Sequence, residues 1–155
     1  MGPLDALINA ALPWIIRLAG LFWLIGSFAL FRQIQVEMAL DRAAALRKSP
    51  GGNANERWAD RDDAARRGWI AGQAVVLMAT AIAMILLLVI AAWMAALLVI
   101  GQGLYFFWRE WTARRAPTAE AALHARPSAA TVNAGWVSLA VAMLVWMAGF
   151  RGLLN

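Results

Sequence analysis

The chain has 155 residues, of which 63% are hydrophobic and only 15% are charged, whereas a typical soluble domain carries about 25% charged residues. It has no cysteine and a single histidine, His124, which excludes disulfides, thiolate metal sites, a cysteine nucleophile and a bis-histidine haem site. The net charge of +5 does not indicate a nucleic-acid partner, because the basic residues lie in loops between apolar segments, as at the cytoplasmic face of membrane proteins. We therefore expect an all-α integral membrane protein with no cofactor.

The first apolar segment, at about residues 13–31, is long enough for one membrane span. Pro13 favours the start of a helix, so residues 3–12 form either an interfacial helix or the first turns of a tilted span. After Phe31 the sequence remains rich in good helix formers. We expect the helix to continue into water and to end near Lys48, where a serine, a proline and two glycines follow.

A charged helix is predicted at about residues 55–67, capped by Asn53 or Asn55. Two Asp-to-Arg pairs have the four-residue spacing and the order that stabilise a helix: Asp62–Arg66 and Asp63–Arg67. We interpret this helix as a solvated face rather than as a docking surface.

Residues 69–108 contain no charged side chain over 40 positions. A bilayer core needs about 20 helical residues for one crossing, so this segment predicts a transmembrane hairpin. Its turn is expected near residues 89–93, which gives spans of about 69–90 and 93–111.

A connection at about residues 112–130 follows, with two turns of helix capped by Thr118 and with His124 exposed to solvent. The last span is predicted at about residues 131–150. The other long loop is at about residues 32–67.

The basic residues decide how four spans are oriented. Residues 32–67 and 109–126 together hold 12 of the 14 lysines and arginines, and only Arg17 and Arg151 lie elsewhere. Four crossings put both loops on one side of the membrane, whereas three would separate them. Positive loops remain in the cytoplasm, so we expect one transmembrane domain over residues 1–155 in a bacterial-type inner membrane, with both termini outside.

Arg17 is the charged residue that lies inside a predicted span, and such residues are functional candidates by default. It is only four residues past Pro13, so its side chain is able to snorkel to the outer headgroups. Arg151 is expected at the same level, and lipid-phosphate contact is the favoured role of both. Asp5 is the nearest carboxylate to pair with Arg17.

Uncharged polar residues also lie within the predicted spans: Gln73, Thr80, Gln102, Asn133 and Ser138. Such groups commonly form hydrogen bonds between helices, and this is their expected role. No carboxylate is embedded in a span, since Glu110 falls where the span at 93–111 ends, and this absence counts against a proton-coupled transporter.

The apolar spans and the two charged cytoplasmic segments favour a non-catalytic accessory or structural subunit of a larger membrane complex. Its partners would be membrane lipids and other membrane protein subunits. The alternative is a small homo-oligomeric channel or transporter in which Arg17, Gln73, Gln102 and Asn133 line the path. A lipid-modifying enzyme has the least support, because the sequence shows no pair of nucleophile and base.

Overall fold

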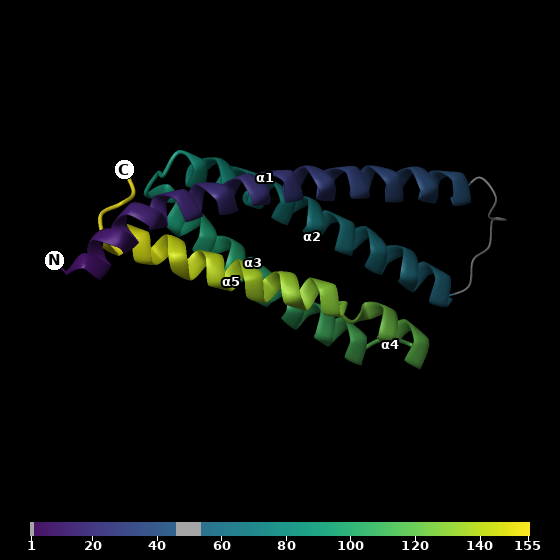
Figure 1. Cartoon of the computed structure of the whole chain (residues 1–155). Coiled ribbons are helices and arrows are strands. Elements are labelled where there is room, and N and C mark those ends of the chain that lie inside the picture. The colour runs from purple at the N-terminus through teal and green to yellow at the C-terminus, as the bar shows by residue number, and fades with distance from the viewer. Residues whose placement is uncertain (1, 46–53) are drawn as a thin grey trace.

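A computed structural model describes residues 2–45 and 54–155 of the chain (Figure 1). The regular elements of these residues are the α-helices α1 (Pro3–Ala45), α2 (Ala54–Ile85), α3 (Ile90–Arg114), α4 (Ala119–Ala125) and α5 (Ala129–Phe150). Four segments are long and apolar enough to cross a membrane: Pro3–Ala43, Trp58–Ile85, Ile90–Arg114 and Ala119–Phe150. The prediction of an all-α chain with four such helical segments is thereby confirmed.

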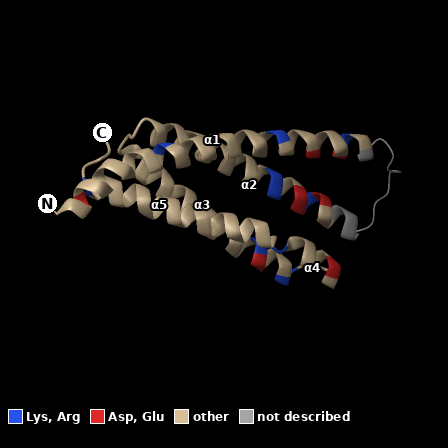
Figure 2. Ribbon diagram, viewed as in Figure 1, with Lys and Arg blue, Asp and Glu red and all other residues tan. Residues whose placement is uncertain are grey.

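The long helices run roughly along one axis. The α1 helix packs along α2, and α3 contacts α2, α4 and α5, while α1 meets α5 near the two termini. Both termini lie at one end of the molecule (Figure 1). Figure 2 shows that most charged residues gather at the opposite end, on the outer parts of α1 and α2 and around α4. The two basic segments of the sequence are therefore neighbours in space.

Small residues make up much of the interior. The fully buried alanines are Ala74, Ala81, Ala91, Ala95, Ala125 and Ala148. They allow close helix contact, which is closest at Gly20, where an added Cβ atom would lie 2.9 Å from the carbonyl oxygen of Ala81. Large side chains such as those of Phe22, Phe107 and Phe150 are instead more than 70% exposed. Close packing of small residues with large apolar groups outside is typical of helices that meet in lipid.

Two predicted helix boundaries differ from the observed ones. The α1 helix begins at Pro3 and contains Pro13 in its interior, so residues 3–12 are the first turns of the long helix, which is the second of the two alternatives, and Pro13 does not start it. The charged helix and the second span are one continuous helix, α2, in which Asn55 lies inside the helix and is not its N-cap. The predicted stop at residues 49–52 and the alternative cap Asn53 lie outside the described residues.

The turn between α2 and α3 lies at residues 86–89, earlier than the predicted 89–93. Leu87 adopts a positive φ of 53°, a conformation that is uncommon for a residue with a Cβ atom. The end of the chain pairs with this turn: the backbone N–H of Asn155 donates to the carbonyl of Leu87 at 2.7 Å, and the N–H of Val89 donates to the carbonyl of Asn155 at 2.8 Å. A contact far along the sequence thus holds a turn that has no glycine or proline of its own.

The ion pairs predicted within α2 do not form, and the interhelical partners account for the difference. Arg66 donates to Glu37 of α1 at 3.2 Å and lies 3.6 Å from Asp63, and Arg67 pairs with Asp41 of α1. Two arginines of α2 therefore tie the outer parts of α1 and α2 together. The interpretation of this helix as a purely solvated face is wrong on the side that meets α1.

The expected pairing of Asp5 with Arg17 is also wrong. The two residues are 12 positions apart on one continuous helix, which separates them by about 18 Å along its axis. Asp5 lies instead 3.7 Å from Arg151, which also donates to the side-chain oxygen of Asn9 at 3.0 Å. This contact joins the start of α1 to the end of α5.

Candidate functional site

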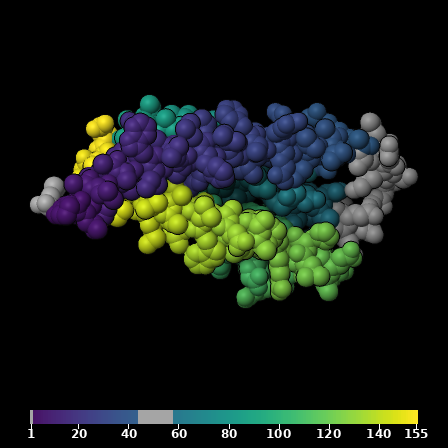
Figure 3. Space-filling model, viewed as in Figure 1, coloured from purple at the N-terminus to yellow at the C-terminus, as the bar shows by residue number. Residues whose placement is uncertain are grey.

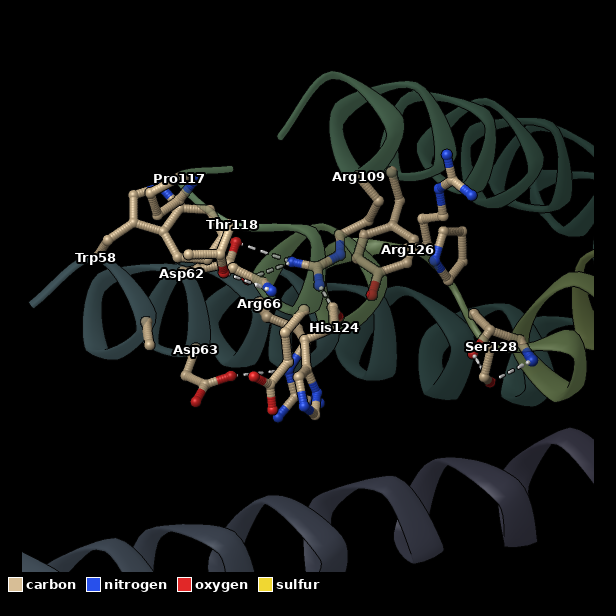
Figure 4. A pocket seen from close by; sticks show the side chains of 16 residues that line it. Trp58, Asp62, Asp63, Arg66, Arg109, Pro117, Thr118, His124, Arg126 and Ser128 are labelled. Carbon is tan, nitrogen blue, oxygen red and sulfur yellow. Dashed lines mark hydrogen bonds and ion pairs between the residues drawn. The ribbon is translucent and has the colours of Figure 1, made fainter. Parts of the chain in front are cut away.

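A cavity of about 640 Å³ lies at the charged end of the molecule, between α2, α3, α4 and the start of α5. Figure 3 shows the surface at this end, where α2 is visible in a recess between α1 and the chain of α4 and α5. The polar and aromatic residues that line the cavity (Figure 4) are Trp58, Asp62, Asp63, Arg66, Tyr105, Arg109, Thr118, Glu120, His124, Arg126, Ser128 and Thr131.

Arg109 of α3 forms the inner wall of the cavity and is only 2% exposed. One terminal nitrogen donates to both carboxylate oxygens of Asp62 on α2, at 2.9 Å each, and the other donates to the backbone carbonyl of His124 at 2.9 Å. Removing a guanidinium from water costs several kcal/mol unless a charged partner is present. Asp62, whose side chain is 10% exposed, supplies that partner. One side chain thereby links three helices.

Chain geometry brings Asp62 and Arg109 together. Arg66 lies 19 residues before the end of α2, and Arg109 lies 19 residues after the start of α3. These two positions therefore face each other across the antiparallel hairpin, and Asp62 is one helical turn farther from the turn. The side chain of Arg109 is long enough to reach one helical turn farther along α2, to Asp62. Next to the pair, Trp69 of α2 stacks on Trp108 of α3, with ring centroids 6.1 Å apart.

The short helix α4 closes one side of the cavity. The hydroxyl of Thr118 accepts a hydrogen bond from the backbone N–H of Ala121 at 3.2 Å, which confirms the predicted cap. Ser128 caps α5 in the same way, by accepting from the N–H of Thr131 at 3.2 Å. The imidazole of His124 is exposed, as predicted. His124 contacts Arg109 through its backbone carbonyl, which accepts the hydrogen bond from the guanidinium.

Several polar groups on the wall have no partner within the described part of the chain. The carboxylate of Glu120, the imidazole of His124 and the hydroxyl of Tyr105 make no hydrogen bond there. Arg126 is 60% exposed, and its nearest carboxylate is Glu110, at 3.9 Å. Glu120, His124 and Tyr105 are therefore free to contact a molecule in the cavity, and Arg126 is held only by this long ion pair.

The charges on the cavity wall balance. The cations are Arg66, Arg109 and Arg126, and the carboxylates are Asp62, Asp63 and Glu120. The deepest pair is Asp62 and Arg109, whose side chains already bind each other. Glu120 and Arg126 lie at the rim. The arrangement therefore offers both a cation and a carboxylate to one bound molecule. Among the described residues, no group of three or more histidine, aspartate or glutamate side chains is placed to hold a metal ion.

The residues predicted from the sequence as polar or lipid-contact sites do not line this cavity. Gln73 packs against Gly101 between α2 and α3, and its buried side-chain oxygen has no hydrogen-bond partner among the described residues. Gln102 donates to the hydroxyl of Ser138 at 3.1 Å between α3 and α5. Asn133 is exposed on α5.

The two predicted arginine sites are at the terminal end. The guanidinium of Arg17 lies over the ring of Trp14, at 5.3 Å from its centroid, and Arg151 contacts Asp5 and Asn9. A second hollow of about 240 Å³ lies between α3 and α5, and its lining is largely apolar: Val99, Gln102, Gly103, Phe106, Val132, Gly135, Trp136 and Leu139.

Sequence reasoning missed Asp62 and Arg109 as a site. The register of the hairpin would have revealed this contact, because residues at equal distances from the turn face each other. A turn at about position 91 places Arg109 opposite Gln73, whereas the observed turn places it opposite Arg66. A shift of a few residues in the turn therefore concealed the contact. Comparison of the chain with models of known protein families, with curated proteins and with solved structures finds no match.

Proposed function

We propose that this chain is a four-span protein of a bacterial-type inner membrane that serves as a non-catalytic accessory subunit of a larger membrane complex. Its four apolar segments would pack as one bundle, with the charged end in the cytoplasm and both termini outside. The distribution of charge supports this orientation, because the basic residues that the structure describes, other than Arg17 and Arg151, lie toward one end of the molecule and cytoplasmic loops carry the excess of basic residues.

The exposed face of α1 is the observation that supports a subunit role. Large exposed apolar side chains share one face of this helix, in groups at residues 4–7, 15–25 and 36–40, and the gaps between the groups hold Ala11, Ala29 and Gln33. We call this set the α1 stripe, and its members are Leu4, Leu7, Ile15, Leu18, Phe22, Ile25, Val36 and Leu40. Each is at least 46% exposed. The opposite face of α1 carries the contacts with α2.

The α1 stripe is longer than lipid is able to cover. From Leu4 to Leu40 it extends about 54 Å along the helix, or about 51 Å along the membrane normal at a typical tilt of about 20°. A bilayer with its headgroups is about 40–45 Å thick. At least one end of the stripe is therefore outside lipid, where exposed apolar side chains gain free energy from contact with protein. An apolar helix of another subunit fits this face.

Photo-cross-linking in native membranes tests the proposal. A photoreactive amino acid at Leu40, within the α1 stripe, is expected to cross-link to one membrane protein in high yield. The matched control is Met38, which is 40% exposed and is on the other side of α1, where cross-linking to that protein should be weak. Substitution Leu40→Glu should lower co-purification of the same protein at least several-fold, and Met38→Glu should leave it unchanged.

Equal cross-linking from both positions, or products with lipid alone, would contradict a subunit role. Flux of ions or small molecules through liposomes that contain only this chain would also contradict it and would favour the channel or transporter. In that case Arg17→Ala should abolish the flux if Arg17 lines the path.

A further inference from the structure

We propose that the cavity at the charged end binds the headgroup of a zwitterionic phospholipid that carries a phosphate and a primary ammonium group. The proposal depends on the membrane orientation proposed above, but it does not depend on a partner subunit. It assigns a ligand class to the cavity formed by α2, α3, α4 and the start of α5.

The inner end of the cavity lies where a lipid headgroup would lie. Its inner wall contains Tyr105, whose ring lies 6.1 Å from that of Trp69 and 6.0 Å from that of Trp108. Tryptophan and tyrosine rings concentrate at the headgroup level of a membrane, and the headgroup layer is about 5–7 Å thick on each side. The cavity begins at this aromatic layer and extends outward to Trp58.

The molecule also leaves a lateral approach to the cavity. The α1 and α5 helices meet near the termini and diverge toward the charged end (Figure 1). The recess between α1 and the chain of α4 and α5 exposes α2 at the surface (Figure 3). A phospholipid of the cytoplasmic leaflet would reach the cavity with its headgroup through this recess, while its acyl chains stayed against the apolar helices.

The charges on the wall favour a zwitterion over an anion. His124 is free to contact a phosphate, and the exposed Arg126, whose ion pair with Glu110 is long at 3.9 Å, is able to reach one as well. Glu120 is free to accept hydrogen bonds from an ammonium group. The rings of Trp58 and Tyr105 line the same space and attract a cation through their faces. An anionic headgroup without an amine would meet as many carboxylates as cations and would leave Glu120 without a partner.

A primary ammonium suits the carboxylates better than a quaternary one. Its three N–H groups donate charge-assisted hydrogen bonds to Glu120 and Asp63, and these bonds are about twice as strong as neutral ones. A trimethylated nitrogen has no N–H to donate. Phosphatidylethanolamine is the chemical class that meets both requirements, and phosphatidylglycerol and phosphatidylcholine each lack one feature.

Native mass spectrometry of the purified full-length chain in mild detergent tests the assignment. Phosphatidylethanolamine, phosphatidylglycerol and phosphatidylcholine with identical acyl chains are added in equal amounts. We expect at least threefold more bound phosphatidylethanolamine than either competitor. The substitution Glu120→Gln should remove this preference, and Arg126→Gln should lower the binding of all three lipids. Both side chains are exposed, so folding should be retained.

The control is Arg114→Gln, which makes the same charge change at the same end of the molecule but outside the cavity, at a side chain that is 76% exposed. It should bind lipid as the unchanged protein does. Equal or stronger binding of phosphatidylglycerol would overturn the proposal, as would Glu120→Gln and Arg126→Gln variants that behave like this control. Soluble glycerophosphoethanolamine that binds as tightly as the lipid would identify a soluble ligand and overturn the lipid assignment.

These outcomes are separate from those of the subunit proposal. Lipid selectivity is measured on the isolated chain, and cross-linking from Leu40 is measured in native membranes. A negative result in one experiment therefore does not change the interpretation of the other.

Discussion

Arg109 and Asp62 form a forked ion pair between α3 and α2, with one guanidinium nitrogen 2.9 Å from each carboxylate oxygen. The second terminal nitrogen of Arg109 holds the backbone carbonyl of His124 at the end of α4. The pair thus fixes the hairpin and positions α4 over the cavity. Because Arg109 is 2% exposed, the contact is shielded from the solvent screening that weakens most surface ion pairs.

Substitution Asp62→Asn should destabilise the protein strongly. It leaves the guanidinium of Arg109 buried without a counter-charge, and breaking such a pair from one side costs about 3–5 kcal/mol. Thermal unfolding in detergent, followed by circular dichroism, should show a clear drop in the midpoint. The control Glu110→Gln removes a carboxylate that pairs with the exposed Arg114 and should change stability by less than about 1 kcal/mol. Equal losses for the two variants would show that Asp62 is not the special partner of Arg109.

Substitution Gly20→Val should weaken the contact between α1 and α2. A Cβ atom there would lie 2.9 Å from the backbone oxygen of Ala81 and 3.1 Å from the Cβ atom of Met84, and neither neighbour is the flexible end of a side chain. Overpacking of this kind costs about 1–3 kcal/mol. The control is Gly26→Val on the same helix, where an added Cβ atom meets nothing within 4 Å. A loss of thermal stability in the Gly26 variant that matches the Gly20 loss would argue against close packing at Gly20.

Substitution Leu154→Ala tests whether the end of the chain holds the turn between α2 and α3. Leu154 is 7% exposed and belongs to the apolar core, so its truncation should cost about 2–5 kcal/mol of unfolding free energy. Hydrogen exchange at the backbone N–H groups of Val89 and Asn155 should become faster, because the first donates to the carbonyl of Asn155 and the second to the carbonyl of Leu87. Phe150→Ala is the control, since Phe150 is 82% exposed. Unchanged exchange at the turn in the Leu154 variant would contradict this role.

Single cysteines report the orientation directly, because the chain has none of its own. A membrane-impermeant maleimide should label Ala43→Cys and Ala119→Cys only after the inner membrane is permeabilised. It should label Asn155→Cys in intact spheroplasts. All three positions are exposed. If all three cysteines were labelled from the same side of the membrane, the proposed topology would be ruled out.

The sequence predicted the helices well and their contacts poorly. The uncharged segment at 69–108 and the clustering of basic residues predicted four apolar helical segments, and Thr118 was correctly predicted as a cap. The partners of Asp5, Asp62 and Arg66 were predicted wrongly. Each of these side chains had a plausible partner nearby in sequence, but in the structure each contacts another helix.

What the sequence by itself determined is the all-α character of the chain and its division into long apolar segments, because hydropathy and length are additive properties of consecutive residues. Only the tertiary structure decided that the turn falls at residues 86–89, that Arg109 is buried against Asp62, and that α4 lies beside a cavity. These features depend on helix register, and a shift of a few residues, at about 1.5 Å each, changes which side chains meet across two antiparallel helices.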